Sequence, residues 1–117
     1  PYVLDVNRKG SKKRLAELAR KTGMVKSGQA GKSDGDIADS LIAQVRELIA
    51  TLNIDPTVKN MQSSDFNDIA KAAAKEVSDT YAVPTYLSAA EIKDILTKIK
   101  QASDEHASRD AKTGKVA

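Results

Sequence analysis

Apolar residues recur at every third or fourth position along most of the chain, the spacing that places them on one face of an α-helix. The clearest run comprises Ile37, Leu41, Val45, Leu48 and Leu52. Asp34 precedes it as the expected N-cap, since a carboxylate there accepts hydrogen bonds from free amides of the first turn. Pro56 lies beyond its end. The pattern predicts a long amphipathic helix between these two residues.

A helix is also predicted on either side of this run. The earlier one follows Ser11 as a cap, carries Leu15, Leu18 and Ala19 on one face, and ends before Gly23. The later one follows Ser64 as a cap, and its apolar face comprises Phe66, Ile69, Ala70, Ala73 and Val77. Residues 26–35 are rich in glycine, serine and lysine and are expected to form a loop. Residues 80–87 are expected to break the later helix.

The fourth predicted helix has the most specific start. Ser88 and Glu91 fit a capping box, in which the hydroxyl serves the amide three residues on and the carboxylate reaches back. The apolar stripe behind it is Ile92, Ile95, Leu96 and Ile99. From Ser103 the sequence is polar without a stripe, so too little apolar surface is left to offset the entropy of ordering. This predicts a helical domain over residues 1–102 and a polar, flexible tail over residues 103–117.

The four runs together indicate the fold class. No segment alternates like a half-buried strand, and no internal repeat is visible. One Phe, three Tyr and no Trp leave the core to Leu, Ile, Val and Ala, which suits packed helices. We expect an all-α fold, a bundle of about four main helices.

Composition excludes several kinds of chemistry. The 117 residues include no Cys, which removes disulfides, thiolate metal sites and Cys nucleophiles, and fits a reducing compartment. His106 is the only histidine, so a catalytic triad or a histidine-based metal centre would have to use it. Because it stands in the predicted tail, we expect a solvated side chain. We predict no catalytic residue and no metal ligand in this chain.

The net charge and the hydropathy of the chain bear on the expected classes of partner and on the expected location. The net charge is +3, and the densest basic cluster, Lys9, Lys12, Lys13 and Arg14, has no aromatic residues between its members. We expect it to be a solvated helix face and do not expect nucleic acid as a partner. No run approaches the roughly 20 apolar residues of a membrane span, and no signal peptide is visible. The expected location is cytoplasmic.

Two segments suggest a function at first sight. Residues 28–33, Gly-Gln-Ala-Gly-Lys-Ser, are similar to the end of a phosphate-binding loop, but Lys26 stands where that motif needs Gly and no strand precedes it. We expect an interhelical loop. Tyr81, Pro84 and Tyr86 lie between two predicted helices, where the rings would line a groove or the core; core packing is favoured.

Five phrases follow one another in a fixed order along the chain. They are Pro-Tyr-Val-Leu-Asp-Val-Asn at 1–7, Leu-Ala-Glu-Leu-Ala-Arg at 15–20, the segment 42–54 with its Leu-Asn-Ile-Asp-Pro end, Asp-Phe-Asn-Asp-Ile-Ala-Lys-Ala-Ala at 65–73, and Ser-Ala-Ala-Glu-Ile-Lys-Asp-Ile-Leu at 88–96. In this order they resemble the C-terminal, dehydroquinate-synthase-like helical domain of the iron-dependent alcohol dehydrogenases. The resemblance covers about residues 1–100.

The resemblance implies a parent enzyme that moves a hydride between NAD(P) and an alcohol or aldehyde. Its N-terminal domain would bind the dinucleotide, and Fe²⁺ or another divalent metal would lie in the cleft between the domains. The family's ligands, one Asp and three His, precede the phrase that begins this chain, so none is carried over. With its start at Pro1 rather than Met, we expect a fragment that walls the substrate cleft and is inactive alone. Its implied partners are the N-terminal domain, a small alcohol or aldehyde and, optionally, further copies of the protein.

One departure from the family pattern supplies the only pocket candidates. Many members read Cys-Thr and then Asn-Pro-Arg where residues 78–84 are Ser-Asp-Thr-Tyr-Ala-Val-Pro. The Cys, which is close to the substrate in some relatives, maps to Ser78, so the resemblance implies Ser78 and Tyr81 as pocket-lining residues. A role in ending and packing the helix is the simpler interpretation. The alternative function is a small helical protein-interaction module that binds a partner helix or an acidic surface.

Overall fold

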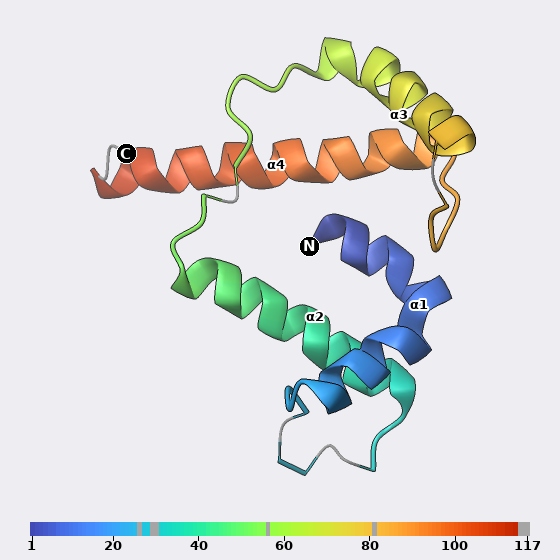
Figure 1. The fold of residues 1–117 in the computed structure, drawn as a ribbon. Coiled ribbons are helices and arrows are strands. Elements are labelled where there is room, and N and C mark those ends of the chain that lie inside the picture. Colours follow the sequence, from blue (N-terminus) through green and yellow to red (C-terminus); the bar gives the residue numbers. More distant parts are fainter. Residues whose placement is uncertain (26, 29–30, 56, 81, 115–117) are drawn as a thin grey trace. The chain divides into compact units, whose positions relative to one another are not determined.

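The computed structural model describes residues 1–25, 27–28, 31–55, 57–80 and 82–114, without the side chains of residues 78–80 and 113. Its long helices are α1 (Tyr2–Lys21), α2 (Asp34–Thr51), α3 (Phe66–Thr80) and α4 (Ala89–Thr113). A single 3₁₀ turn, η1 (Ser63–Asp65), precedes α3 (Figure 1). The described residues contain no strand, so the all-α prediction is confirmed. None of these helices is both long and apolar enough to cross a membrane.

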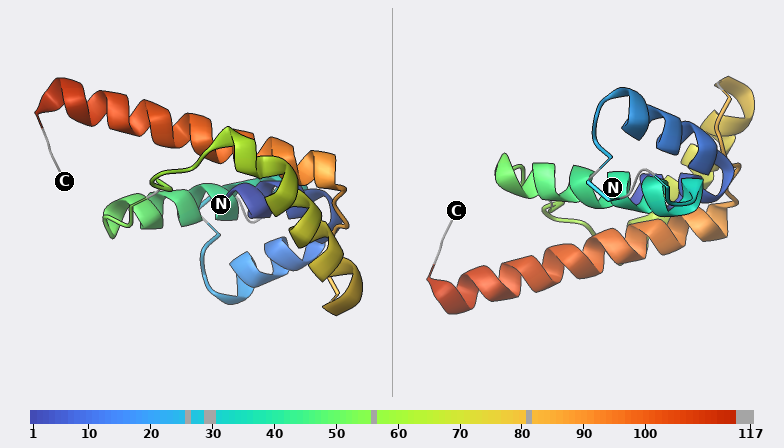
Figure 2. Two further views of the ribbon diagram at one scale, coloured as in Figure 1. Left: turned by 90° about the horizontal axis from the view of Figure 1, so that it is seen from above. Right: turned by 90° about the horizontal axis from the view of Figure 1, so that it is seen from below.

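The chain forms two compact units, Pro1–Ile54 and Asp55–Ala117. In the N-terminal unit α1 packs against α2, and in the C-terminal unit α3 packs against α4 (Figure 2). Each unit is therefore a helical hairpin with its own buried contacts, and each is considered by itself below.

The core of the N-terminal unit joins small residues of α1 to large ones of α2. Ala16 and Ala19 are fully covered and meet Ile37 and Leu41, which are also buried. Alanine at the contact lets the two helix backbones approach closely. Leu48 and Leu52, which belong to the predicted apolar stripe, are instead 52% and 59% exposed. Periodicity placed all these residues on one face, but it does not say how much of that face another helix covers.

The predicted starts of the first two helices need correction. The first helix begins at Tyr2 rather than after Ser11, because α2 supports its early turns: Asp5 pairs with Arg46, and Arg8 pairs with Asp39. The N-cap of α2 is Ser33, whose Oγ accepts a hydrogen bond from the Asp36 amide at 3.2 Å. Asp34, predicted as the cap, is the first helical residue, where its negative charge suits the helix dipole.

The C-terminal unit buries Phe66 and Ala70 of α3 and Ile95 of α4. The predicted capping box is confirmed: Ser88 Oγ accepts from the Glu91 amide, and Glu91 Oε2 accepts from the Ser88 amide at 2.8 Å. Ser64 was predicted to cap α3 but lies within η1, and its hydroxyl bonds the Asp65 carboxylate.

The last helix is longer than the sequence pattern predicts. Residues 103–113, expected to form a tail without helical structure, continue α4 as far as Thr113. Two side-chain pairs between residues four apart support the extra turns, namely the ion pair of Lys100 with Asp104 and the contact of His106 Nδ1 with Asp110 Oδ2 at 3.0 Å. Gly114 follows in the left-handed conformation, which favours glycine, and ends the helix. The flexibility of this polar segment and the boundary at residue 102 stay predictions.

Candidate functional site

The C-terminal unit contains a groove of about 360 Å³ between the start of α3 and the middle of α4. Ser63 and the buried Phe66 form one wall. The other wall is a row of polar side chains on α4, namely Lys93, Thr97, Lys100, Gln101 and Asp104. Sequence reasoning missed these residues, although their spacing of three and four marks them as one polar face of the helix.

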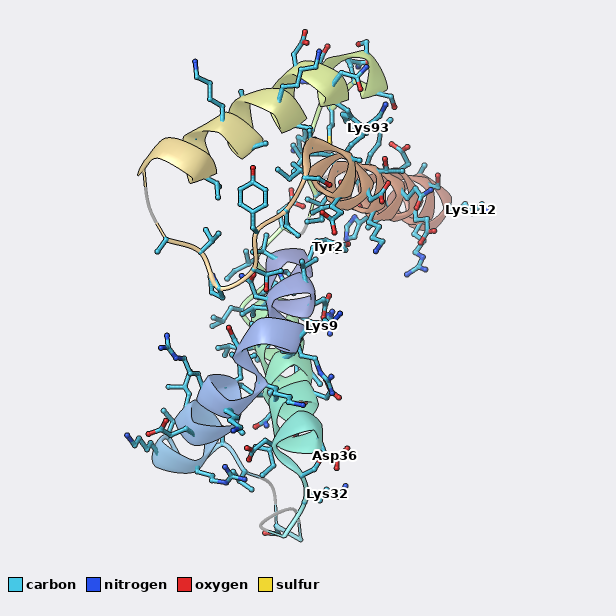
Figure 3. All side chains as sticks on the ribbon, turned by 90° about the vertical axis from the view of Figure 1, so that its right-hand side faces the viewer. Tyr2, Lys9, Lys32, Asp36, Lys93 and Lys112 are labelled. Carbon is cyan, nitrogen blue, oxygen red and sulfur yellow. The ribbon has the colours of Figure 1, made fainter. Side chains whose placement is uncertain are left out.

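The charged groups of the groove are already engaged within the protein. Lys93 Nζ donates to Asn67 Oδ1 at 2.9 Å, and Lys100 Nζ donates to both carboxylate oxygens of Asp104 at 3.0 and 3.2 Å. Figure 3 shows Lys93 on α4 where that helix lies against α3. The groove therefore presents hydroxyl, amide and paired ionic groups around one aromatic ring, and its lining contains no histidine or thiol.

One predicted pocket residue, Ser78, belongs to the last turn of α3, but its side chain is outside the described part of the chain. The other, Tyr81, lies outside the described residues altogether. The role of these two residues stays a prediction.

The segment that follows Tyr81 contains a buried polar atom without a partner. Thr85 Oγ1 has no hydrogen-bond partner among the described atoms. Burying a hydroxyl without one is costly, so such an atom marks a place that a water, a ligand or another part of a protein completes. The prediction that the tyrosine rings of this segment pack into the core is wrong for Tyr86, which is 63% exposed.

The loop with the Gly-Lys-Ser sequence does not form a phosphate cradle among its described residues. Ser33 uses its hydroxyl as the N-cap of α2 and also donates to Asp36 Oδ2 at 2.7 Å. Lys32 is exposed, and Figure 3 shows it with Asp36 at the same end of the N-terminal unit. Three residues of the predicted loop, Lys26, Gln29 and Ala30, lie outside the described residues.

The basic cluster of α1 is exposed at all four positions, Lys9, Lys12, Lys13 and Arg14. No ion pair or hydrogen bond joins these side chains to other described residues, whereas Arg8, Arg20 and Arg46 each pair with an aspartate. The expectation of a solvated helix face fits this arrangement.

The shifted pKa values among the described groups come from structural contacts. The lowered pKa of Glu91 arises from hydrogen bonds donated by Ser88, and the lowered pKa of Asp55 arises mainly from those donated by Thr57. The pKa of Arg8 is raised by its hydrogen bonds and attraction to Asp39. Each shift favours the charged form of the side chain, as in a structural contact, rather than moving its pKa toward neutral pH.

Comparison with known protein families decides the identity of the domain. A family model described as "Fe-containing alcohol dehydrogenase family, C-terminal" matches residues 1–100. The chain belongs to this family. The match covers nearly all of the 117 residues and both helical units up to the middle of α4. No curated protein and no solved structure matches the chain.

The residues of this alcohol dehydrogenase domain do not fit the metal that the family name implies. Within the described part of the chain no three His, Cys, Asp or Glu residues gather as a metal-binding group. The single histidine, His106, places Nδ1 3.0 Å from Asp110 Oδ2 on the surface of α4, beyond the family match. A centre with several histidines cannot be built from this sequence.

Proposed function

We propose that this chain is the later part of the helical C-terminal domain of a cytoplasmic, NAD(P)-dependent and divalent-metal-dependent alcohol dehydrogenase. It forms part of the wall of the substrate cleft, and it does not catalyse the reaction alone. The metal and dinucleotide sites belong to the part of the parent protein that precedes these helices. The parent reaction is hydride transfer between NAD(P) and a small alcohol or aldehyde.

The family match over residues 1–100 carries this proposal. The residue inventory supports the claim of inactivity, because one histidine and no cysteine leave too few ligands for the centre that the family implies. The all-helical fold supports it as well, since dinucleotide binding of the Rossmann type needs a strand, a glycine-rich turn and a helix.

The end of α3 and the segment after it form the part of the wall next to the substrate in this proposal. Ser78 and Tyr81 are the pocket-lining residues, as the resemblance implies. The unpartnered hydroxyl of Thr85, four residues after Tyr81, supports a missing neighbour at this place. The parent's N-terminal domain or the bound substrate would supply it.

The test compares the 117-residue chain with the product of its parent reading frame. Each protein is supplied with Fe²⁺, with NAD⁺ or NADP⁺, and with a panel of short alcohols, and nicotinamide reduction is followed by absorbance. We expect turnover for the parent and none for the chain. Turnover by the isolated chain, free of parent enzyme, would disprove its inactivity.

The upstream reading frame tests the parent assignment separately. It should encode a glycine-rich βαβ unit followed by one Asp and several His. An upstream frame without these features would overturn the dehydrogenase proposal even if the isolated chain proved inactive.

The second candidate function is a helical interaction module without catalytic activity. The observation that favours it is the cluster Lys9, Lys12, Lys13 and Arg14, which is exposed and has no acidic partner among the described residues. Such a cluster would attract an acidic protein surface in a salt-dependent manner. Saturable, salt-sensitive binding of a defined acidic protein by the chain, lost when all four cations are replaced by Gln, would support the module.

A further inference from the structure

The part of α4 that follows the family match contains a buried residue, although its sequence is polar. We call residues 101–113 the C-terminal extension; the match ends at residue 100, and the helix ends at Thr113. Ser103, in the first turn of the extension, is only 8% exposed. Among the described residues it is the one polar residue that is buried. Burying a hydroxyl is tolerated when its hydrogen bonds are made, so the partners of Ser103 show what the extension does.

Ser103 uses its hydroxyl both as donor and as acceptor. The Oγ atom donates to the Ile99 carbonyl at 2.9 Å, within α4, and accepts from the Val58 amide at 3.1 Å. The second bond spans 45 positions in the sequence. It therefore ties the C-terminal extension to the segment with which the C-terminal unit begins.

Segment 57–60 and the preceding Asp55 are shaped by local features of the backbone and side chains. Asp55 Oδ1 accepts hydrogen bonds from the Thr57 amide at 2.9 Å and the Thr57 hydroxyl at 2.6 Å, and Asn60 has a left-handed φ of 61°. These features bend the backbone without attaching it to a helix. Among the described atoms, the Val58 bond to Ser103 is the one that attaches the backbone of this segment to a helix.

A second residue of the extension lies near Asp55. Hydrogen bonds from Thr57 are the main cause of the lowered pKa of Asp55, and the charges of Lys59 and His106 act in the same direction. His106 follows Ser103 by about one helical turn, which agrees with the extension running past this part of the chain.

We propose that the C-terminal extension of α4 anchors segment 57–60, with Ser103 Oγ as the point of attachment. The start of the C-terminal unit is then held by a residue outside the family-matched part of the chain. When Ser103 cannot accept the Val58 hydrogen bond, segment 57–60 opens locally while α3 and α4 stay packed.

A measurement on the unsubstituted 117-residue protein tests this proposal. Amide hydrogen exchange followed by NMR should show the Val58 amide protected and the Lys59 amide fast, because only the former has an acceptor in the described structure. Fast exchange of Val58, at the rate of Lys59, would overturn the proposal without any substitution.

A matched pair of substitutions tests the hydrogen bond from the Val58 amide to Ser103 Oγ. Ser103→Ala removes the acceptor of Val58. Ser108→Ala removes a hydroxyl that donates to the Asp104 carbonyl at 2.9 Å on the same helix and bonds no residue of segment 57–60. We expect Ser103→Ala to speed Val58 exchange roughly five- to tenfold, the equivalent of one lost hydrogen bond, and Ser108→Ala to leave it unchanged.

Trypsin cleavage after the exposed Lys59 gives an independent readout of the same opening. Cleavage should become faster in Ser103→Ala and not in Ser108→Ala, with the circular dichroism of both variants equal to that of the unchanged protein. The proposal would be overturned if Val58 exchange and Lys59 cleavage had the same rates in the unchanged protein and in both variants. It would also be overturned if Ser103→Ala and Ser108→Ala accelerated them equally.

Discussion

The guanidinium of Arg8 on α1 forms two parallel hydrogen bonds with the carboxylate of Asp39 on α2. Its Nε and Nη2 atoms donate to Asp39 Oδ1 and Oδ2, each at 2.6 Å. Arg8 Nη2 also lies 3.4 Å from the Gly35 carbonyl oxygen, so one guanidinium contacts two successive turns of α2. This fork geometry is specific to arginine and explains how the first half of α1 stays aligned with α2.

Replacing Asp39 by Asn should lower the thermal unfolding midpoint of the protein slightly, and less so in high salt. The amide keeps the shape but loses the charge that attracts Arg8, and the pair is solvent-exposed and therefore screened. Glu47→Gln is the control, since Glu47 is an exposed acid on the same helix without an ion pair among the described residues. An equal loss for both variants, or a loss independent of salt, would contradict a specific Arg8–Asp39 contribution.

Two isoleucines in the same unit should respond very differently to truncation. Ile37 is 1% exposed within the α1–α2 core, whereas Ile54 is 52% exposed just beyond α2. Ile37→Ala removes buried methyl groups and leaves a cavity, which typically costs about 2–5 kcal/mol of unfolding free energy. Ile54→Ala should cost less than about 1 kcal/mol. Urea unfolding of both variants measures the difference, and similar losses would show that the core lies elsewhere.

Acid should weaken the protein through two carboxylates that are hydrogen-bonded only in the folded state. The pKa of Glu91 is lowered by bonds from Ser88, and the pKa of Asp55 is lowered by bonds from Thr57. A lowered folded-state pKa means that the contribution is complete above the unfolded value, near pH 4. It is lost as the pH falls through the lower folded-state pKa.

The variant Glu91→Gln tests the direction of this acid dependence. It should flatten the decline in stability below about pH 4, while Glu105→Gln, at an exposed position later in α4, should not. NMR titration of the Glu91 carboxyl carbon gives the pKa directly. A value at or above the ordinary one would contradict the role of the capping box.

Among the predicted helix starts, the one with two reciprocal signals is correct, whereas the single caps predicted at Ser11, Asp34 and Ser64 are wrong. The Ser88 and Glu91 capping box requires only two residues three positions apart, so the start of α4 could be predicted without knowledge of the fold. The all-α class followed equally directly from the apolar spacing. The start of α1 did not, because its early turns depend on Arg8 and Asp5 pairing with residues more than 30 positions away.

The same distinction explains the incomplete prediction of the site and of α4. The polar composition after Ser103 predicted no helix, because neither side-chain pairs four residues apart, such as Lys100 with Asp104, nor the long-range bond between Ser103 and Val58 produces an apolar stripe. The groove beside Phe66 arises only when α3 lies on α4. Ser78 and Tyr81 came from the family resemblance alone, so they need a test in the parent enzyme.

Substitution of Ser78 or Tyr81 in the parent enzyme should change the use of the alcohol more than the fold. Tyr81→Phe and Ser78→Ala each remove one hydroxyl, and the loss of a neutral hydrogen bond to substrate would raise KM roughly fivefold. The matched control is Tyr86→Phe, since Tyr86 is exposed in the neighbouring segment and is not among the predicted pocket residues. Steady-state kinetics with NAD⁺ or NADP⁺ held saturating would measure KM for the alcohol, and thermal unfolding would report on the fold. Unchanged KM values for Ser78→Ala and Tyr81→Phe would indicate that these residues only end and pack α3. An equal change of KM in Tyr86→Phe would instead indicate a general loosening of the segment.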